Sequence, residues 1–266
     1  MLRLRYALRS FERAAIYTIH GFCQRVLQDF PLLTGHSPNL SLRKNMRPVT
    51  LALAEDFWRK TITQAHPVLA GYLVGQQLTP EKLLAELPTG LRHHTQVLTV
   101  ENPPDLEPLW DIWVVQYHLA KNLWAEAVSV AQLMEFARHG QLHGKTHTFD
   151  ILEKVRLAWE RYFAAAVPLL PHPKALKQLE RLGLNALLKG RTQKTPAAFH
   201  TVLQHPLWQT LEAFAAQCQQ LQAVLALHYQ QLLAQLRTHC LAALPEHHRH
   251  AQEFSYDDLA RNLRLA

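Results

Sequence analysis

The stretch AAIYTIHGFCQRVL, residues 14–27, places a hydroxyl and an imidazole where an apolar segment gives way to a helix. Its first four residues are typical of a short strand, and Thr18 is typical of the residue that caps a helix start. The first turn of a helix has unpaired N–H groups and a partial positive charge, which together stabilise a phosphate. His20 would add a donor there, and Arg25 a full charge. The residues alone leave two interpretations open: a phosphate-binding site, or a plain helix cap beside a histidine with ordinary partners.

A second candidate for phosphate chemistry is the segment GQLHGKT, residues 140–146, which ends like the Walker A loop GxxxxGK[ST]. That pattern requires a glycine at position 139, which is His139 here, and a strand before the loop. Residues 128–138 have the apolar spacing of a helix instead. The sequence therefore predicts no nucleotide site in this segment.

Three histidines recur at every fourth residue, as metal ligands on one face of a helix can: His139, His143 and His147. The glycines between them disfavour a continuous helix, and no carboxylate or thiol lies among them. The histidine-rich segment 246–250 is typical of a solvated loop with a little metal affinity. Neither segment predicts a metal site.

The segment SYDD, residues 255–258, contains paired carboxylates, which hold a metal or transfer protons when they are buried together. It also fits the pattern Ser-x-x-Asp, in which Ser255 caps a helix start and Asp258 interacts with the same turn. We favour the helix cap. Because the sequence has no G-x-S-x-G elbow and no family-specific cysteine signature, it predicts no catalytic residue.

Composition indicates a globular chain outside membranes. Of 266 residues, 48% are hydrophobic and 18% are charged, and no run approaches the roughly 18 apolar residues that cross a bilayer. The arginine-rich N-terminus has neither a long apolar core nor a small-residue cleavage site, so no secretory signal is predicted. Three cysteines without a CxxC pair favour a reducing cytoplasm.

The positive charge is concentrated at the N-terminus. Residues 1–60 hold ten Lys and Arg against four Asp and Glu, which is a net +6 of the chain's +7. A second basic run lies at residues 174–194, where Glu180 is the one acid. Its cations are Lys174, Lys177, Arg181, Lys189, Arg191 and Lys194. Such clusters favour polyanions such as nucleic acids, although a merely basic protein surface is an equal alternative on composition alone.

Apolar residues recur mostly at spacings of three and four, and only nine glycines interrupt the chain, so we predict a mainly α fold with at most one short strand near the N-terminus. The expected helices are 19–30, 50–64, 80–87, 108–138, 149–166, 174–188 and 206–244. Loops are expected at 139–147 and 189–198. The helix 206–244 keeps one apolar face that drifts at His228 and has few charged flanks, which favours a core-spanning bundle helix over a dimerising coiled coil.

The opening stretch resembles the TIHGFCQR motif of the RecB family, the exodeoxyribonuclease V beta chains among the UvrD-like superfamily 1 helicases. Three further segments follow in the family's order. EDFWRK at 55–60 resembles its ADFWRR segment, HPL at 205–207 resembles the start of its long helix, and FSYDDL at 254–259 resembles its GFDDML segment. The first motif is highly specific, and the resemblance spans almost the whole chain.

In that family the TIHGFCQR motif belongs to the RecA-like motor subdomain 1A and contacts the sugar-phosphate backbone of single-stranded DNA. The resemblance implies that residues 1–30 are a piece of 1A, residues 31–251 are the helical accessory subdomain 1B, and residues 252–266 return into 1A. To the motif residues we add a basic cluster that follows them. The candidate DNA-binding residues are Thr18, His20, Arg25, Arg43, Lys44 and Arg47.

The motor's Walker A lysine, its DEFQDT-like segment and a nuclease domain are missing from the sequence. We therefore expect a fragment that neither hydrolyses ATP nor cuts DNA and needs no cofactor, cut from a parent ATP-dependent DNA helicase and exodeoxyribonuclease V that uses ATP and Mg²⁺. The expected location is the bacterial cytoplasm.

The resemblance implies a role in double-strand break repair and recombination, through DNA contacts rather than catalysis. The implied partners are DNA, as a single strand and a fork, and RecC-like and RecD-like subunits, with no membrane. The alternative is a helical scaffold that docks partner subunits of a RecBCD-type complex.

Overall fold

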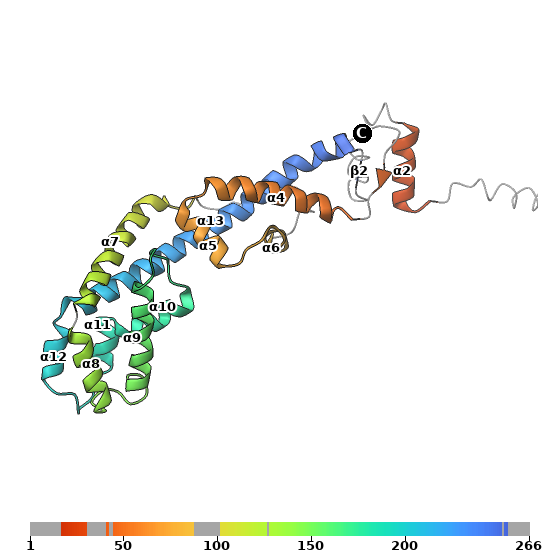
Figure 1. Cartoon of the computed structure of the whole chain (residues 1–266). Helices are drawn as coiled ribbons and strands as arrows, with labels where there is room; N and C mark the ends of the chain where they lie inside the picture. The colour runs from red at the N-terminus through yellow and green to blue at the C-terminus, as the bar shows by residue number, and fades with distance from the viewer. Residues whose placement is uncertain are drawn as a thin grey trace, which may run out of the picture. The chain divides into compact units, whose positions relative to one another are not determined.

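The computed structural model describes residues 17–30, 41–42, 45–87, 102–126, 128–251 and 253–254. These residues are mainly helical, as predicted (Figure 1). The helices are α2 (Ile19–Asp29), α4 (Arg47–Gln64), α5 (Pro67–Gly75), α6 (Pro80–Glu86), α7 (Leu106–Ala125), α8 (Val128–Arg138), α9 (Phe149–Phe163), α10 (Pro173–Leu179), the 3₁₀ turn η1 (Glu180–Leu182), α11 (Leu184–Lys189), α12 (Ala198–Leu203) and α13 (Pro206–Ala251). None of the described helices is both long and apolar enough to span a bilayer.

The chain forms two compact units. Unit 1 comprises Met1–Lys60, Thr79–Val97 and Ala234–Ala266, and unit 2 comprises Thr61–Leu78 and Leu98–Leu233. These divisions do not test the expected subdomain boundaries at residues 30 and 252, which stay predictions.

The long C-terminal helix α13 confirms the sequence prediction of a core-spanning helix and extends it by one turn or more. The nine apolar residues predicted to share its inner face are all buried: Leu207, Leu211, Phe214, Cys218, Leu221, Leu225, Leu232, Leu236 and Cys240. The helix continues through Pro245, although the predicted helix ends at residue 244.

Two predicted helices are each broken in the structure. The expected helix 108–138 divides into α7 and α8, because on one continuous helix the buried residues of α8 would lie about 140° from those of α7. The break lets α8 turn its apolar face toward α9 and α12. The expected helix 174–188 divides into α10, η1 and α11 at Gly183, whose backbone is extended. Short helices α5 and α12 were not predicted.

Two short strands pair with each other, one before α4 and one after α13. Strand β1 (Ser41–Leu42) pairs in parallel with β2 (Glu253–Phe254), with Ser41 opposite Glu253 and Leu42 opposite Phe254. Residues 43–252 are thus an excursion that leaves and returns at neighbouring strands. The sequence did not predict this pair, and the strand expected at 14–17 lies outside the described residues except for Tyr17, which is not in a strand.

Aromatic side chains build the core of unit 2. Trp113, Trp159 and Phe214 are completely buried, and the rings of Trp113 and Trp159 each lie within 6 Å of the Phe214 ring, at 5.7 and 5.9 Å. The buried indoles keep hydrogen bonds, as buried polar groups require. The Trp159 Nε1–H donates to the Leu179 carbonyl at 3.1 Å, which fixes α9 against the end of α10.

Candidate nucleic-acid interface

The start of α2 has the cap that the sequence predicts. Thr18 has an extended backbone, and its Oγ1 accepts a hydrogen bond of 3.2 Å from the backbone N–H of Gly21. A hydroxyl that accepts one bond still has its own proton to donate. Thr18 and His20 are both exposed, so the first turn of α2 can be reached from solvent.

Gly21 leaves little room beside this cap, since a Cβ at that position would lie 3.3 Å from Thr18 Oγ1. Two aromatic rings flank the cap, Tyr17 just before it and Phe22 in the first turns of α2, and neither was predicted as a site residue. Tyr17 is 42% exposed and Phe22 is 53% exposed. Bases of single-stranded nucleic acid stack on such exposed rings.

Arg25 is on the surface of α2 and already has partners. Its Nε–H donates to Asp29 at 3.2 Å, one of its terminal N–H groups donates to the Tyr17 hydroxyl at 2.5 Å, and its guanidinium lies 5.5 Å from the centre of the Tyr17 ring. Hydrogen bonding to Asp29 raises the pKa of Arg25 above its ordinary value. A phosphate would therefore compete with Asp29 for this cation.

The other N-terminal candidates are only partly described. Arg43 and Lys44 lie outside the described residues. Arg47 is exposed at the first position of α4, where its backbone N–H donates to the side-chain oxygen of Asn45 at 2.9 Å. None of the described contacts links Arg47 to the candidate residues of α2, so its place in the same DNA-binding site stays a prediction.

In unit 2 the second basic run forms what we call the basic surface, whose side chains are all exposed. Its members are Lys174, Lys177, Arg181, Lys189, Arg191 and Lys194. The first two are on α10, the third is on η1, and the rest follow from the end of α11. The one acid in this run, Glu180, accepts a hydrogen bond of 2.6 Å from the side chain of Gln219. Charges this dense and this little neutralised are typical of polyanion-binding surfaces.

The two predicted loops meet and hold part of the basic surface in place. Leu142 and Arg191 form an antiparallel bridge, and the His143 N–H donates to the Gly190 carbonyl at 2.8 Å. The Thr195 hydroxyl donates to the Gln141 carbonyl at 2.6 Å. We call this arrangement the loop clasp. It fixes the backbone on both sides of Arg191.

His147 is buried beneath the loop clasp. Its Nδ1 is 2.9 Å from the hydroxyl of Thr146, and its ring is packed against Gly190. Burial lowers the pKa of His147, and the charges of His143 and Arg181 lower it further, while the backbone of Ala186 opposes them.

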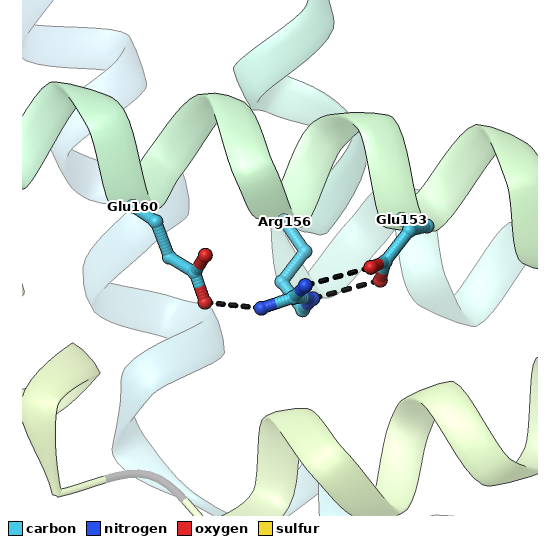
Figure 2. Close-up of polar contacts among 3 residues, drawn as sticks. All are labelled: Glu153, Arg156 and Glu160. Atoms are coloured by element: carbon cyan, nitrogen blue, oxygen red, sulfur yellow. Dashed lines mark hydrogen bonds and ion pairs between the residues drawn. The ribbon is translucent and has the colours of Figure 1, made fainter.

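Arg156 on α9, unlike the cations of the basic surface, is paired with two carboxylates of its own helix. Figure 2 shows Arg156 between Glu153 and Glu160 on α9. Its Nε and one terminal nitrogen donate to the two oxygens of Glu153 at 2.8 and 2.7 Å, and its other terminal nitrogen donates to Glu160. Bidentate pairing of this kind holds the cation to its helix.

The other segments considered for phosphate or metal chemistry are the GKT segment, the spaced histidines and residues 255–258. The GKT segment follows helix α8, as the sequence analysis expects. Of the spaced histidines, His139 lies 3.7 Å from Glu135, while His143 and His147 share the hydroxyl of Thr146. Within the described ranges, no three His, Cys, Asp or Glu side chains are grouped as metal ligands. Residues 255–258 lie outside those ranges.

Comparison with known proteins finds similarity to one subunit of the RecBCD enzyme. No protein-family model matches the chain. It is 32% identical over 115 residues to the RecBCD enzyme subunit RecB of Haemophilus influenzae, 43% of this chain and 9% of that protein. It is 28% identical over 125 residues to RecB of Escherichia coli K12, which is 46% of this chain and 10% of that protein. It is 31% identical over 88 residues to RecB of Buchnera aphidicola subsp. Schizaphis graminum, which is 33% of this chain and 7% of that protein.

The described residues form a mainly α-helical protein with an exposed, capped helix start in unit 1 and a basic surface in unit 2. The chain is related to RecB, the subunit of RecBCD enzymes, as the resemblance implied. Its matches cover no more than a tenth of the length of these relatives.

Proposed function

We propose that this chain is a DNA-binding accessory part of a RecB-like helicase-nuclease that acts in double-strand break repair and recombination. It contributes sugar-phosphate contacts rather than catalysis. The observation that carries this proposal is the exposure of Thr18 and His20 at the capped start of α2, inside the segment that resembles the family's DNA-contacting motif. A buried pair would have been unable to reach a phosphate.

Two features support a wider role in DNA binding. The basic surface of unit 2 offers six exposed cations within 21 residues of sequence, held in part by the loop clasp. The pairing of β1 with β2 makes residues 43–252 an excursion between two neighbouring strands, which supports the proposal of an accessory subdomain inserted into a motor. ATP, Mg²⁺ and RecC-like and RecD-like partners belong to the proposed parent enzyme, and the cytoplasm is its proposed location.

Fluorescence anisotropy with a labelled forked duplex, at two salt concentrations, tests the α2 contact. Thr18→Ser keeps both the cap and the hydroxyl, so it should bind like the wild type. Thr18→Val loses both, and His20→Ala loses only a donor, so we expect each to weaken binding several-fold. Thermal unfolding separates the cost of the lost cap, about 1 kcal/mol, from the loss of binding. Equal affinity for all four proteins would refute the α2 contact.

The same titration tests the basic surface independently. Lys174→Gln with Lys177→Gln should lower the slope of log K against log salt by about 2, because each lost phosphate contact removes roughly 0.9. The control pair, Lys154→Gln with Arg161→Gln, removes the same charge from exposed positions on α9. Equal losses for the two pairs would show that net charge alone drives binding.

A further inference from the structure

The outer side of α7 carries an apolar ridge that has no covering element among the described residues. Ile112 is 48% exposed, Val115 is 65% exposed and Leu119 is 45% exposed. Their spacing of three and four places them on one line along the helix, which with the exposed Pro108 is about 16 Å long. The opposite side of α7 is in the core through Trp113, Tyr117 and Ala120. Helix α7 is thus apolar on two sides, and only one of them is covered by the described residues of unit 2.

Two acidic side chains lie on the same helix as the ridge. Helix α7 holds Glu107 and Asp111 against one cation, Lys121. Asp111 is exposed on α7 one residue before Ile112, and Glu107 is exposed one turn earlier, paired with His66 at 2.9 Å. The Nζ of Lys121, the one lysine of α7, lies 5.8 Å from the centre of the buried Tyr117 ring, on the core side of the helix.

We propose that this face of α7 docks a partner protein through a helix whose apolar residues are flanked by lysine or arginine. A straight ridge on one helix fits the groove between side-chain rows on another, and the flanking carboxylates favour a basic partner. DNA is disfavoured because the face is acidic and apolar. A second copy of this chain is disfavoured because symmetry would place like charges opposite each other. The inference is independent of the DNA-binding proposal.

The test uses the complete 266-residue chain and a labelled 18-residue helical peptide with a leucine stripe flanked by lysines. A matched peptide carries glutamates in place of the lysines. We expect the lysine peptide to bind, and Val115→Ser with Leu119→Ser to weaken it at least tenfold. Asp111→Asn should weaken it several-fold at low salt. Circular dichroism checks that the variants, all at exposed positions, keep their helix content.

The control is Val167→Ser with Leu169→Ser, which removes residues that are 63% and 64% exposed outside α7. It should change the affinity less than twofold. The proposal is overturned if both pairs of substitutions weaken the peptide equally, or if the glutamate peptide binds as well as the lysine peptide. Two further outcomes would overturn it. One is a dimer of the wild-type chain in sedimentation experiments that the variant Val115→Ser with Leu119→Ser abolishes. The other is a loss of forked-DNA binding in that variant but not in the control.

Discussion

The imidazole of His147 lies against Gly190 so closely that a Cβ on residue 190 would fall 2.7 Å from the Cγ atom of the ring. No real Cβ contact is that short. The backbone of Gly190 is in an ordinary right-handed conformation, so the steric limit comes from the ring and not from glycine's freedom at positive φ. The glycine is needed because the two loops of the clasp close over a buried histidine.

Gly190→Ala should therefore destabilise the protein by about 1–3 kcal/mol, the usual cost of overpacking a filled site. Chemical denaturation measures the change. Gly144→Ala is the matched control in the neighbouring loop, where a Cβ would meet nothing within 4 Å, and it should be neutral or slightly stabilising. Adding His147→Ala to Gly190→Ala should recover part of the loss. Equal stability of the two glycine variants would contradict the packing.

Acid should weaken unit 2 through His147. Because the pKa of His147 is lowered in the folded protein, the unfolded chain binds a proton first as the pH falls below about 6.5. Folding stability then decreases with falling pH, by at most about 1.4 kcal/mol per pH unit from this group. His147→Gln removes the group, so its stability should depend less steeply on pH between 6.5 and 4.5. The comparison concerns the slope, since the substitution also changes the stability itself.

Asp29 should restrain the contribution of Arg25 to DNA binding. We expect Asp29→Asn to strengthen binding to a forked duplex several-fold at low salt, because the guanidinium loses its competing carboxylate. Asp56→Asn is the control, since Asp56 pairs with Lys60 in the same i,i+4 arrangement on α4, at 2.8 Å. It adds the same charge to the chain. An equal gain for both variants would mean that net charge, and not the release of Arg25, strengthens binding.

The buried thiols of α13 should be nearly inert in the folded protein. Burial raises the pKa of Cys218 to about 12 and that of Cys240 to about 11, from an ordinary value of 9.0. At pH 8 the thiolate fraction of Cys218 then falls about a thousandfold and that of Cys240 about a hundredfold. Alkylation followed by peptide mass spectrometry should find both labelled only after denaturant is added. Rapid labelling of either in native buffer would contradict their burial.

The sequence alone determined most of the helices, the two loops and the buried face of α13. These features depend on local periodicity, on capping residues such as Thr18, and on glycine and proline, all of which act within a few residues. The double-sided apolar pattern of α7 was also present in the sequence. A single helix 108–138 was expected instead. On such a helix the apolar residues of α8 would lie on the same side as the exposed ridge of α7, so the ridge would look like part of one buried face.

Tertiary structure alone decided where the predicted helices break, which residues the loops pair with, and what surrounds each charge. Gln141 meets Thr195 across 54 positions, and Gly190 receives the ring of His147, because packing brings together segments that no local pattern relates. Thr18, His20, Arg25 and Arg47 stay predicted DNA contacts, and Arg43 and Lys44 lie outside the described residues. Side-chain type fixed their charge and hydrogen-bonding capacity, whereas exposure and neighbouring carboxylates depend on the fold.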